Sequence, residues 1–161
     1  MSPHTTRVPT ILGYITEKTD CENVLREMAE YLAAAGFVKE TYCQAVLDRE
    51  NAFPTGVPSE PIPVAIPHSD RGHVIKTAIL VAKTAQPIPF RRIDDPNSQI
   101  DVRAIFMLAI DSNQGQLDVI TQIMDLIQDA AVIESIVNAS DPQAIQSAVE
   151  CAFTARQSAS D

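Results

Sequence analysis

The segment that most constrains the fold is an apolar run at residues 104–110, which reads Ala-Ile-Phe-Met-Leu-Ala-Ile. A strand with one solvated face alternates apolar and polar residues, whereas a continuous run is typical of a strand covered on both faces. The chain of 161 residues is 45% hydrophobic and 20% charged, which is enough apolar material for one sizeable core. This composition excludes a disordered or fibrous chain and favours a layered domain.

The remaining patterns predict helices before and after a central group of strands. Helices are expected from a capping box at Thr19 to a stop at Gly36, over residues 39–50, 117–127 and 132–137, and from Asp141-Pro142 onward. Strands are expected over residues 64–66, 77–82 and 102–110, with a short edge piece at residues 87–90. This order predicts the α/β class, with a central mixed β-sheet flanked by helices on both faces. We expect one domain over residues 9–154, with loosely ordered ends at 1–8 and 155–161.

The charge composition excludes some classes of partner. Lys and Arg number 12 against 21 Asp and Glu, a formal net charge of −9, whereas nucleic-acid binding needs a basic surface. No apolar run reaches the roughly 18–20 residues of a membrane span, and residues 1–13 lack a signal-peptide pattern. We therefore expect a cytoplasmic protein without a nucleic-acid partner and without membrane insertion.

Cysteine and histidine are scarce. Cys21, Cys43 and Cys151 are odd in number and show no C-x-x-C spacing, so we expect reduced thiols. His68 and His73 are five residues apart on an expected loop, which is not a metal-ligand spacing. The glycines form no phosphate-binding G-x-G-x-x-G or Walker pattern. The sequence therefore predicts no metal ion, no cofactor and no direct use of ATP.

His68 is the strongest candidate for chemistry. Residues 51–67 hold five of the 11 prolines and end in Ile66-Pro67, directly before this histidine. Pro67 pushes Ile66 toward extended geometry and fixes its own φ, so the imidazole leaves a short strand in a set direction. A neutral imidazole placed in this way can attack a phosphoryl group through one ring nitrogen while its other N–H is held. On spacing alone, an ordinary loop histidine stays open as the alternative.

Donors for the oxygens of a transferring phosphoryl group lie near His68 in the sequence. Arg49 ends the preceding predicted helix, Thr55 lies in a Pro-Thr-Gly turn, and Ser69 directly follows the histidine. Phosphoryl transfer requires little from a protein beyond positioning and such donors. This segment is therefore compatible with a phosphohistidine site.

Three motifs taken together resemble a known family. They are Val46-Leu47-Asp48-Arg49-Glu50, Phe53-Pro54-Thr55-Gly56 and Val64-Ala65-Ile66-Pro67-His68. As a set they resemble the fructose/mannitol-type EIIA domain (EIIA type 2) of the bacterial phosphoenolpyruvate:sugar phosphotransferase system. The expected element order over residues 9–154 fits the same family. Such domains take a phosphoryl group from phosphohistidine on the carrier HPr and pass it to an EIIB domain, which acts with a membrane EIIC permease.

The resemblance implies roles for individual residues. His68 would be phosphorylated and Arg49 would contact the phosphoryl oxygens, with Thr55 and Ser69 as further donors. Mannitol- and fructose-type members carry a second histidine in a His-Leu pair after the long strand, and here that place reads Gln116-Leu117. Glutamine donates hydrogen bonds but carries no proton charge, so we expect Gln116 to act as a neutral donor. This Gln-Leu variant looks most like the galactitol-type branch.

Some alternatives stay open after the resemblance is taken into account. His73, rather than Gln116, could replace the second histidine. The leading function is a phosphocarrier between phospho-HPr and EIIB in the uptake of galactitol or a related polyol or sugar. The alternative is a regulatory nitrogen-type EIIA-like module, which binds target proteins according to its phosphorylation state. An unrelated α/β binding domain with a chance Pro-His pair is the third interpretation.

The acidity of the chain is concentrated toward its C-terminus. Residues 104–161 carry one basic and eight acidic side chains, whereas residues 49–103 carry seven basic and six acidic ones. The segment that holds Arg49 and His68 is thus slightly positive, which suits a site that receives a phosphoryl group. We expect the acidic helices to attract a basic partner face such as that of HPr.

Overall fold

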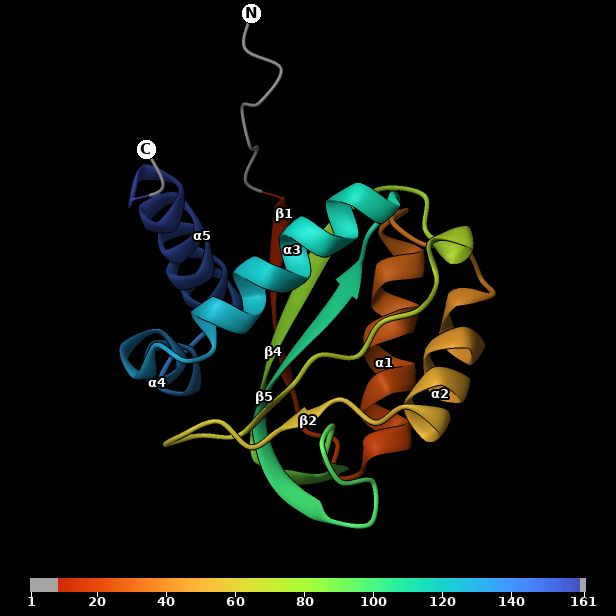
Figure 1. Cartoon of the computed structure of the whole chain (residues 1–161), viewed down its shortest axis with the longest axis horizontal. Coiled ribbons are helices and arrows are strands. Elements are labelled where there is room, and N and C mark those ends of the chain that lie inside the picture. The colour runs from red at the N-terminus through yellow and green to blue at the C-terminus, as the bar shows by residue number, and fades with distance from the viewer. Residues whose placement is uncertain (1–8, 160–161) are drawn as a thin grey trace, which may run out of the picture.

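The chain forms a five-stranded sheet with helices on both faces. The computed structural model describes residues 9–159, apart from the side chains of residues 113–117 and 157–159. Its elements, in chain order, are β1 (Thr10–Thr16), α1 (Cys21–Ala34), α2 (Tyr42–Ala52), β2 (Gly56–Val57), β3 (Val64–Ala65), the 3₁₀ turn η1 (Arg71–His73), β4 (Ala78–Arg91), β5 (Gln99–Ala109), α3 (Asn113–Leu126), α4 (Ala130–Val137) and α5 (Pro142–Ala159). Helices α1 and α2 cover one face of the sheet, and α3, α4 and α5 lie on the other (Figure 1).

The sheet is mixed, as predicted. Its strand order is β1-β4-β5-β3-β2; β1 is parallel to β4 and β3 is parallel to β5, while the β4–β5 and β2–β3 pairs are antiparallel. The apolar run at residues 104–110 is buried throughout. Phe106 and Leu108 pack toward the three C-terminal helices, whereas Ile105 and Met107 pack toward α1 and α2. The continuous run therefore separates two cores, one on each face of the sheet.

Strand β1 is an element that the sequence analysis did not predict. Gly13 interrupts its short apolar stretch, and glycine weakens a strand because it has no side chain to pack. In the fold this glycine lies against the first turn of α5, where an added Cβ would lie 2.0 Å from the carbonyl oxygen of Pro142. The residue that obscures the strand pattern thus allows α5 to approach the sheet closely.

Strand β4 is longer than predicted. The proline-containing piece at residues 87–90, expected as a separate edge piece, is the second half of β4, after a register shift between Lys83 and Ile88. Pairing with β1 ends at Thr84, so beyond that point β4 is bonded to β5 alone. Prolines are tolerated there because an edge strand does not need every N–H for its ladder.

Helix ends also differ from the sequence analysis in detail. The N-cap of α1 is Asp20, not Thr19, since the Asp20 carboxylate accepts a hydrogen bond of 3.0 Å from the Asn23 amide. Gly36 follows α1 with a φ of 87°, the left-handed geometry that glycine adopts without strain. Helix α5 continues to Ala159, past residue 154 where the domain was expected to end. Residues 1–8, expected to be loosely ordered, lie outside the described residues.

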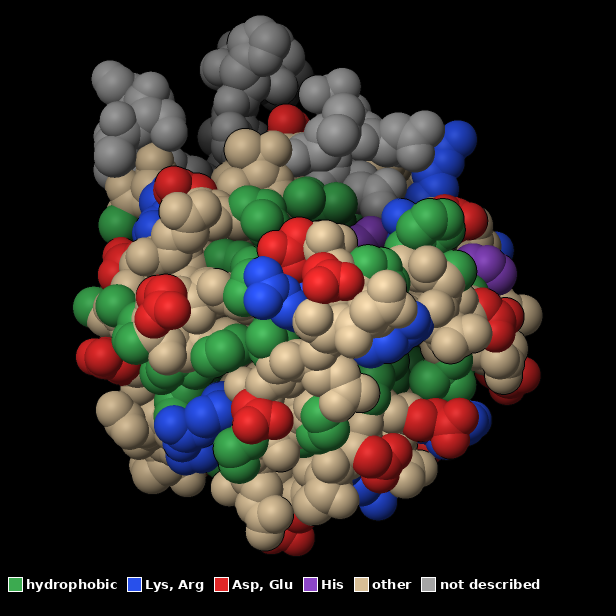
Figure 2. Space-filling model, turned by 60° about the horizontal axis from the view of Figure 1, so that its bottom comes forward, with side chains coloured by type: hydrophobic (Ala, Val, Ile, Leu, Met, Phe, Trp, Pro, Cys, Tyr) green, Lys and Arg blue, Asp and Glu red, His purple; other side chains and the backbone are tan. Residues whose placement is uncertain are grey.

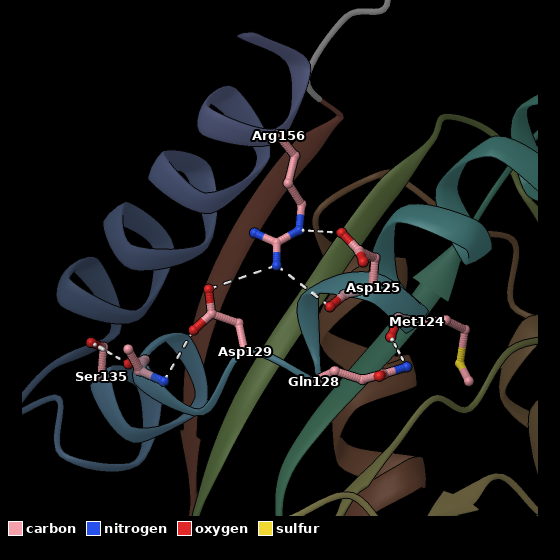
Figure 3. A network of polar contacts seen from close by, with 7 residues as sticks. Met124, Asp125, Gln128, Asp129, Ser135 and Arg156 are labelled. Atoms are coloured by element: carbon pink, nitrogen blue, oxygen red, sulfur yellow. Dashed lines mark hydrogen bonds and ion pairs between the residues drawn. The ribbon is translucent and has the colours of Figure 1, made fainter. Parts of the chain in front are cut away.

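One basic side chain ties the C-terminal helices together (Figure 3). Arg156 on α5 donates to the carboxylate of Asp125 on α3 at 2.9 Å and lies 3.7 Å from the carboxylate of Asp129. Asp129 is also the N-cap of α4, because it accepts a hydrogen bond from the Ala131 amide. Surface ion pairs of this kind contribute about 0–1 kcal/mol each. In the described part of the chain, no helix is both long and apolar enough to cross a membrane.

Candidate functional site

The backbone of His68 pairs with β5 on the same side as β3 does. The amide of Leu108 donates to the carbonyl oxygen of Pro67 at 2.9 Å, and His68 forms an isolated parallel bridge with Leu108. The carbonyl of Leu108 in turn accepts a hydrogen bond of 2.7 Å from the buried hydroxyl of Tyr42 on α2. The histidine follows the short strand β3, and the structure adds a feature that the Pro-His pattern did not predict, the pairing of its backbone with the central strand β5.

The imidazole of His68 has a defined orientation. Its Nδ1 lies 2.8 Å from the carbonyl oxygen of Ile66, and a carbonyl can only accept, so Nδ1 carries the proton and Nε2 keeps its lone pair. Burial lowers the pKa of His68 below its usual value; the bond to Ile66 opposes this shift, the charge of Arg49 adds to it, and Asp70 opposes it. The ring is therefore neutral at pH 7, with an unprotonated Nε2 whose lone pair is chemically able to act as a nucleophile.

Arg49 places a cation beside this ring. It lies in the last turn of α2 with its side chain 38% exposed, and its Nη1 is 3.7 Å from the carboxylate of Asp70. Its guanidinium carbon lies 5.6 Å from the centre of the exposed Phe53 ring. Arg49, Asp70 and His73 line an open hollow of about 440 Å³. Figure 2 shows histidine, basic and hydrophobic side chains close together on the molecular surface.

The Nε of Arg49 is an unused donor. It is buried and finds no hydrogen-bond partner among the described residues. A buried unpaired N–H is costly, so such groups call for an explanation. An anionic oxygen held against the guanidinium would supply the missing acceptor.

Thr55 and Ser69 are near the histidine but are already engaged. The Thr55 hydroxyl donates to the Glu50 carboxylate at 2.7 Å, and the Ser69 hydroxyl donates to the Asp70 carbonyl at 2.9 Å. Each hydroxyl has only one hydrogen. In this arrangement neither side chain has a hydrogen left for a phosphoryl oxygen, whereas the sequence analysis placed both as donors.

Gln116 and His73 are the two candidates for the second-histidine position. The side chain of Gln116, at the start of α3, lies outside the described residues. His73 lies in η1, and its Nδ1 is 2.8 Å from the Thr41 hydroxyl. Within the described part of the chain, no group of three His, Cys, Asp or Glu residues is placed to hold a metal ion.

Sequence reasoning missed Glu50 as part of this site. The residue is only 7% exposed, and its carboxylate accepts hydrogen bonds from both the Thr55 amide N–H, at 2.8 Å, and the Thr55 hydroxyl. Burial raises its pKa, and the two bonds from Thr55 oppose the shift. Arg91 donates to the backbone carbonyls of Glu50 and Asn51 at the end of α2. Asp70 was missed as well. A glutamate beside an arginine usually faces solvent, so the sequence alone held only a weak signal.

Comparison with known proteins assigns the family. Residues 14–151 match the family described as phosphoenolpyruvate-dependent sugar phosphotransferase system, EIIA 2. The chain belongs to the EIIA 2 family. The resemblance inferred from the three motifs is therefore confirmed, and EIIA components are phosphotransfer proteins of that system.

Individual relatives agree with this assignment. The galactitol-specific EIIA component of Escherichia coli (strain K12) is 28% identical over 124 residues, covering 77% of this chain and 82% of the relative. The predicted similarity of this EIIA 2 member to the galactitol type is thus confirmed.

Two solved structures of similar fold come from the mannitol and nitrogen-regulatory types. In the complex of enzyme IIA-mannitol with phosphorylated enzyme IIB-mannitol from Escherichia coli, the matching chain has a TM-score of 0.69 and 23% identity, with 86% of this chain and 92% of that one covered. Nitrogen regulatory protein IIA-Ntr from Neisseria meningitidis has a TM-score of 0.63 and 19% identity, with 86% and 91% covered. Both confirm the α/β fold.

Proposed function

We propose that this protein is a phosphocarrier in which His68 accepts a phosphoryl group from phospho-HPr and passes it to a cognate EIIB component. The observation that carries the proposal is the 2.8 Å contact between His68 Nδ1 and the Ile66 carbonyl, which leaves Nε2 neutral and available. We place the reaction in the cytoplasm, on a single domain, with membrane EIIC downstream. Similarity to the galactitol-specific component supports a polyol or sugar as the transported solute.

The geometry supports transfer of the phosphoryl group to Nε2 of His68. The Nε2 lone pair forms the new N–P bond while the N–P bond to the donor histidine breaks, and the donor ring keeps that electron pair. The Nδ1 proton of His68 stays in place, so the phosphorylated ring gains positive charge and its bond to the Ile66 carbonyl strengthens. Onward transfer to a cysteine thiolate of EIIB reverses these changes. Such transfer depends on positioning and on donors for the phosphoryl oxygens.

Arg49 is the side chain that we propose to hold those oxygens. Its Nε lacks a partner in the described residues, and its 3.7 Å ion pair with the exposed Asp70 is long. Exchange of that weak contact for a phosphoryl oxygen gives a charge-assisted bond in a partly buried place. Gln116 is proposed as a further neutral donor.

Two observations support the proposed acceptor and donor proteins. The complex of similar fold pairs a mannitol IIA with phosphorylated IIB, which supports an EIIB as acceptor. The eight acidic side chains of residues 104–161 support attraction of a basic donor face by long-range charge. Association that is insensitive to salt would contradict this second argument.

Phosphorylation with purified components tests the proposal. Incubation with phosphoenolpyruvate, enzyme I and HPr is expected to label the protein with acid-labile, base-stable phosphate. The His68→Ala variant is expected to stay unlabelled, whereas His73→Ala, which changes the other histidine of the described chain, is expected to label fully. Full labelling of His68→Ala would overturn the assignment.

Onward transfer separates transport from regulation. With labelled protein and a purified EIIB, transport predicts loss of label from His68 and its appearance on EIIB. A structure of similar fold is a nitrogen regulatory protein, and a regulatory function predicts instead stoichiometric binding to another target protein that is lost on phosphorylation. The presence of genes for EIIB and EIIC beside this one would favour transport.

A further inference from the structure

We propose that Glu50 is a positioning residue for phosphoryl transfer: its buried carboxylate holds the backbone chain that orients His68. This inference rests on the proposed function of His68. Glu50 does not contact the imidazole in the structure. Its effect on the histidine is transmitted through two residues. Thr55 is hydrogen-bonded to Glu50 and to Ile66, and Ile66 is hydrogen-bonded to Thr55 and to His68.

The first link joins Glu50 to Thr55. One carboxylate oxygen accepts the Thr55 amide at 2.8 Å and the other accepts its hydroxyl at 2.7 Å. Both residues are buried, with 7% and 3% of their surface exposed. Two charge-assisted bonds to one buried residue restrict its backbone strongly, because breaking either leaves an unpaired group away from water.

The next links run from Thr55 to the ring. The carbonyl of Thr55 accepts the Ile66 amide at 3.2 Å, and the carbonyl of Ile66 accepts Nδ1–H of His68 at 2.8 Å. Pro67, between Ile66 and His68, fixes its own φ and leaves little freedom in this step. A shift of Thr55 therefore moves the acceptor that selects the tautomer of the nucleophile.

The backbone of Glu50 is itself held. Arg91 on β4 donates to the Glu50 carbonyl at 3.2 Å and to the Asn51 carbonyl, two acceptors at the open end of α2. Arg49, which we propose as the phosphoryl contact, precedes Glu50 in the same helical turn. Glu50 thus connects the two sides of the site, the arginine on α2 and the histidine beside β5.

A distant pair offers a matched control. The buried Thr16 hydroxyl donates to the Glu27 carboxylate at 2.5 Å, a Thr–Glu contact like that of Thr55 and Glu50. Thr16 aligns with Thr84 of β4, whereas Leu108 beside His68 aligns with Ile79. The two places lie roughly 16 Å apart along the strand at about 3.3 Å per residue.

The test compares Glu50→Gln and Glu50→Ala with Glu27→Gln in the full chain. For both Glu50 variants we expect phosphoryl acceptance from excess phospho-HPr to slow by about 10-fold or more, with KM for phospho-HPr unchanged. Nitrogen-15 NMR should show a smaller Nδ1–H population of His68, and the Ile66 amide should exchange faster with solvent while core amides such as that of Leu80 stay protected. Glu27→Gln should change none of these.

The measurements of the His68 tautomer and of Ile66 amide exchange need no phosphorylation, so they test the role of Glu50 even if the parent protein is not phosphorylated. Absence of phosphorylation would overturn the proposed function instead. Glu50→Gln keeps the side-chain volume and provides the answer if Glu50→Ala fails to fold. Wild-type acceptance rates in both folded variants would overturn the positioning role. An unchanged His68 tautomer and unchanged Ile66 exchange would also overturn it, whatever the rates.

Discussion

The imidazole Nδ1 of His68 and the carbonyl oxygen of Ile66 lie 2.8 Å apart, and only Pro67 separates the two residues in the chain. Ile66 is buried and its amide is bonded to Thr55, so its carbonyl stays in place. The ring therefore has a defined orientation, with Nδ1 bonded and Nε2 unprotonated, before any partner is present. Preorganisation of this kind reduces the entropy cost of reaching a reactive geometry.

This arrangement predicts a low titration midpoint for His68. Burial, the largest cause, lowers its pKa from the usual 6.5, so NMR titration should give a midpoint below that value with Nδ1–H as the neutral tautomer. Because the folded pKa lies below the unfolded one, this group's contribution to stability is present above pH 6.5 and is lost as pH falls through the folded pKa. The free energies of unfolding of wild type and His68→Gln, measured by urea denaturation, should approach each other as pH falls across this window.

Arg49→Ala is expected to slow phosphoryl acceptance by about 100-fold, the scale of losing one donor to a transition-state oxygen. Its side chain is 38% exposed, so the melting temperature should change little. Stopped-flow mixing with phospho-HPr measures the rate, and Arg26→Ala removes an exposed arginine from α1 as the control. Equal rates for Arg49→Ala and wild type would remove Arg49 from the site.

The three cysteines, predicted as reduced thiols, are free in the structure. Burial raises the pKa of Cys21 to about 12, whereas Cys151 is exposed on α5. Because the thiolate is the reactive form, iodoacetamide at pH 8 should alkylate Cys151 well before Cys21. Mass spectrometry of timed digests measures the order, and earlier modification of Cys21 would contradict its buried position.

Gly13→Ala is expected to destabilise the fold by about 1–3 kcal/mol, the usual cost of overpacking. The added methyl group would meet the Pro142 carbonyl at 2.0 Å, so β1 and α5 would have to separate. Gly72→Ala is the control, since an added Cβ there meets nothing within 4 Å. Chemical denaturation compares the two, and equal midpoints would show that β1 and α5 are not in close contact.

The layered fold could be predicted because periodicity reports burial directly. The uninterrupted run at residues 104–110 indicated a strand between two layers, and Asp141-Pro142 marked the start of α5, where the Asp141 carboxylate accepts the Ala144 amide at 2.8 Å. Strand β1 was not predicted, because its glycine is required by the close approach of a helix that lies far along the chain. Such a requirement leaves no local pattern.

The sequence by itself determined the chemistry available to this protein: one histidine given direction by a preceding proline, an arginine at a helix end, and motifs that identify the EIIA 2 family. The tertiary structure alone decided which hydrogen bonds these groups make. It assigned the Thr55 hydroxyl to Glu50, left Nε of Arg49 without a partner in the described residues, and set the tautomer of His68. The reason is that burial and hydrogen-bond partners depend on which segments meet across α2, β3 and β5, and sequence spacing carries no record of such contacts.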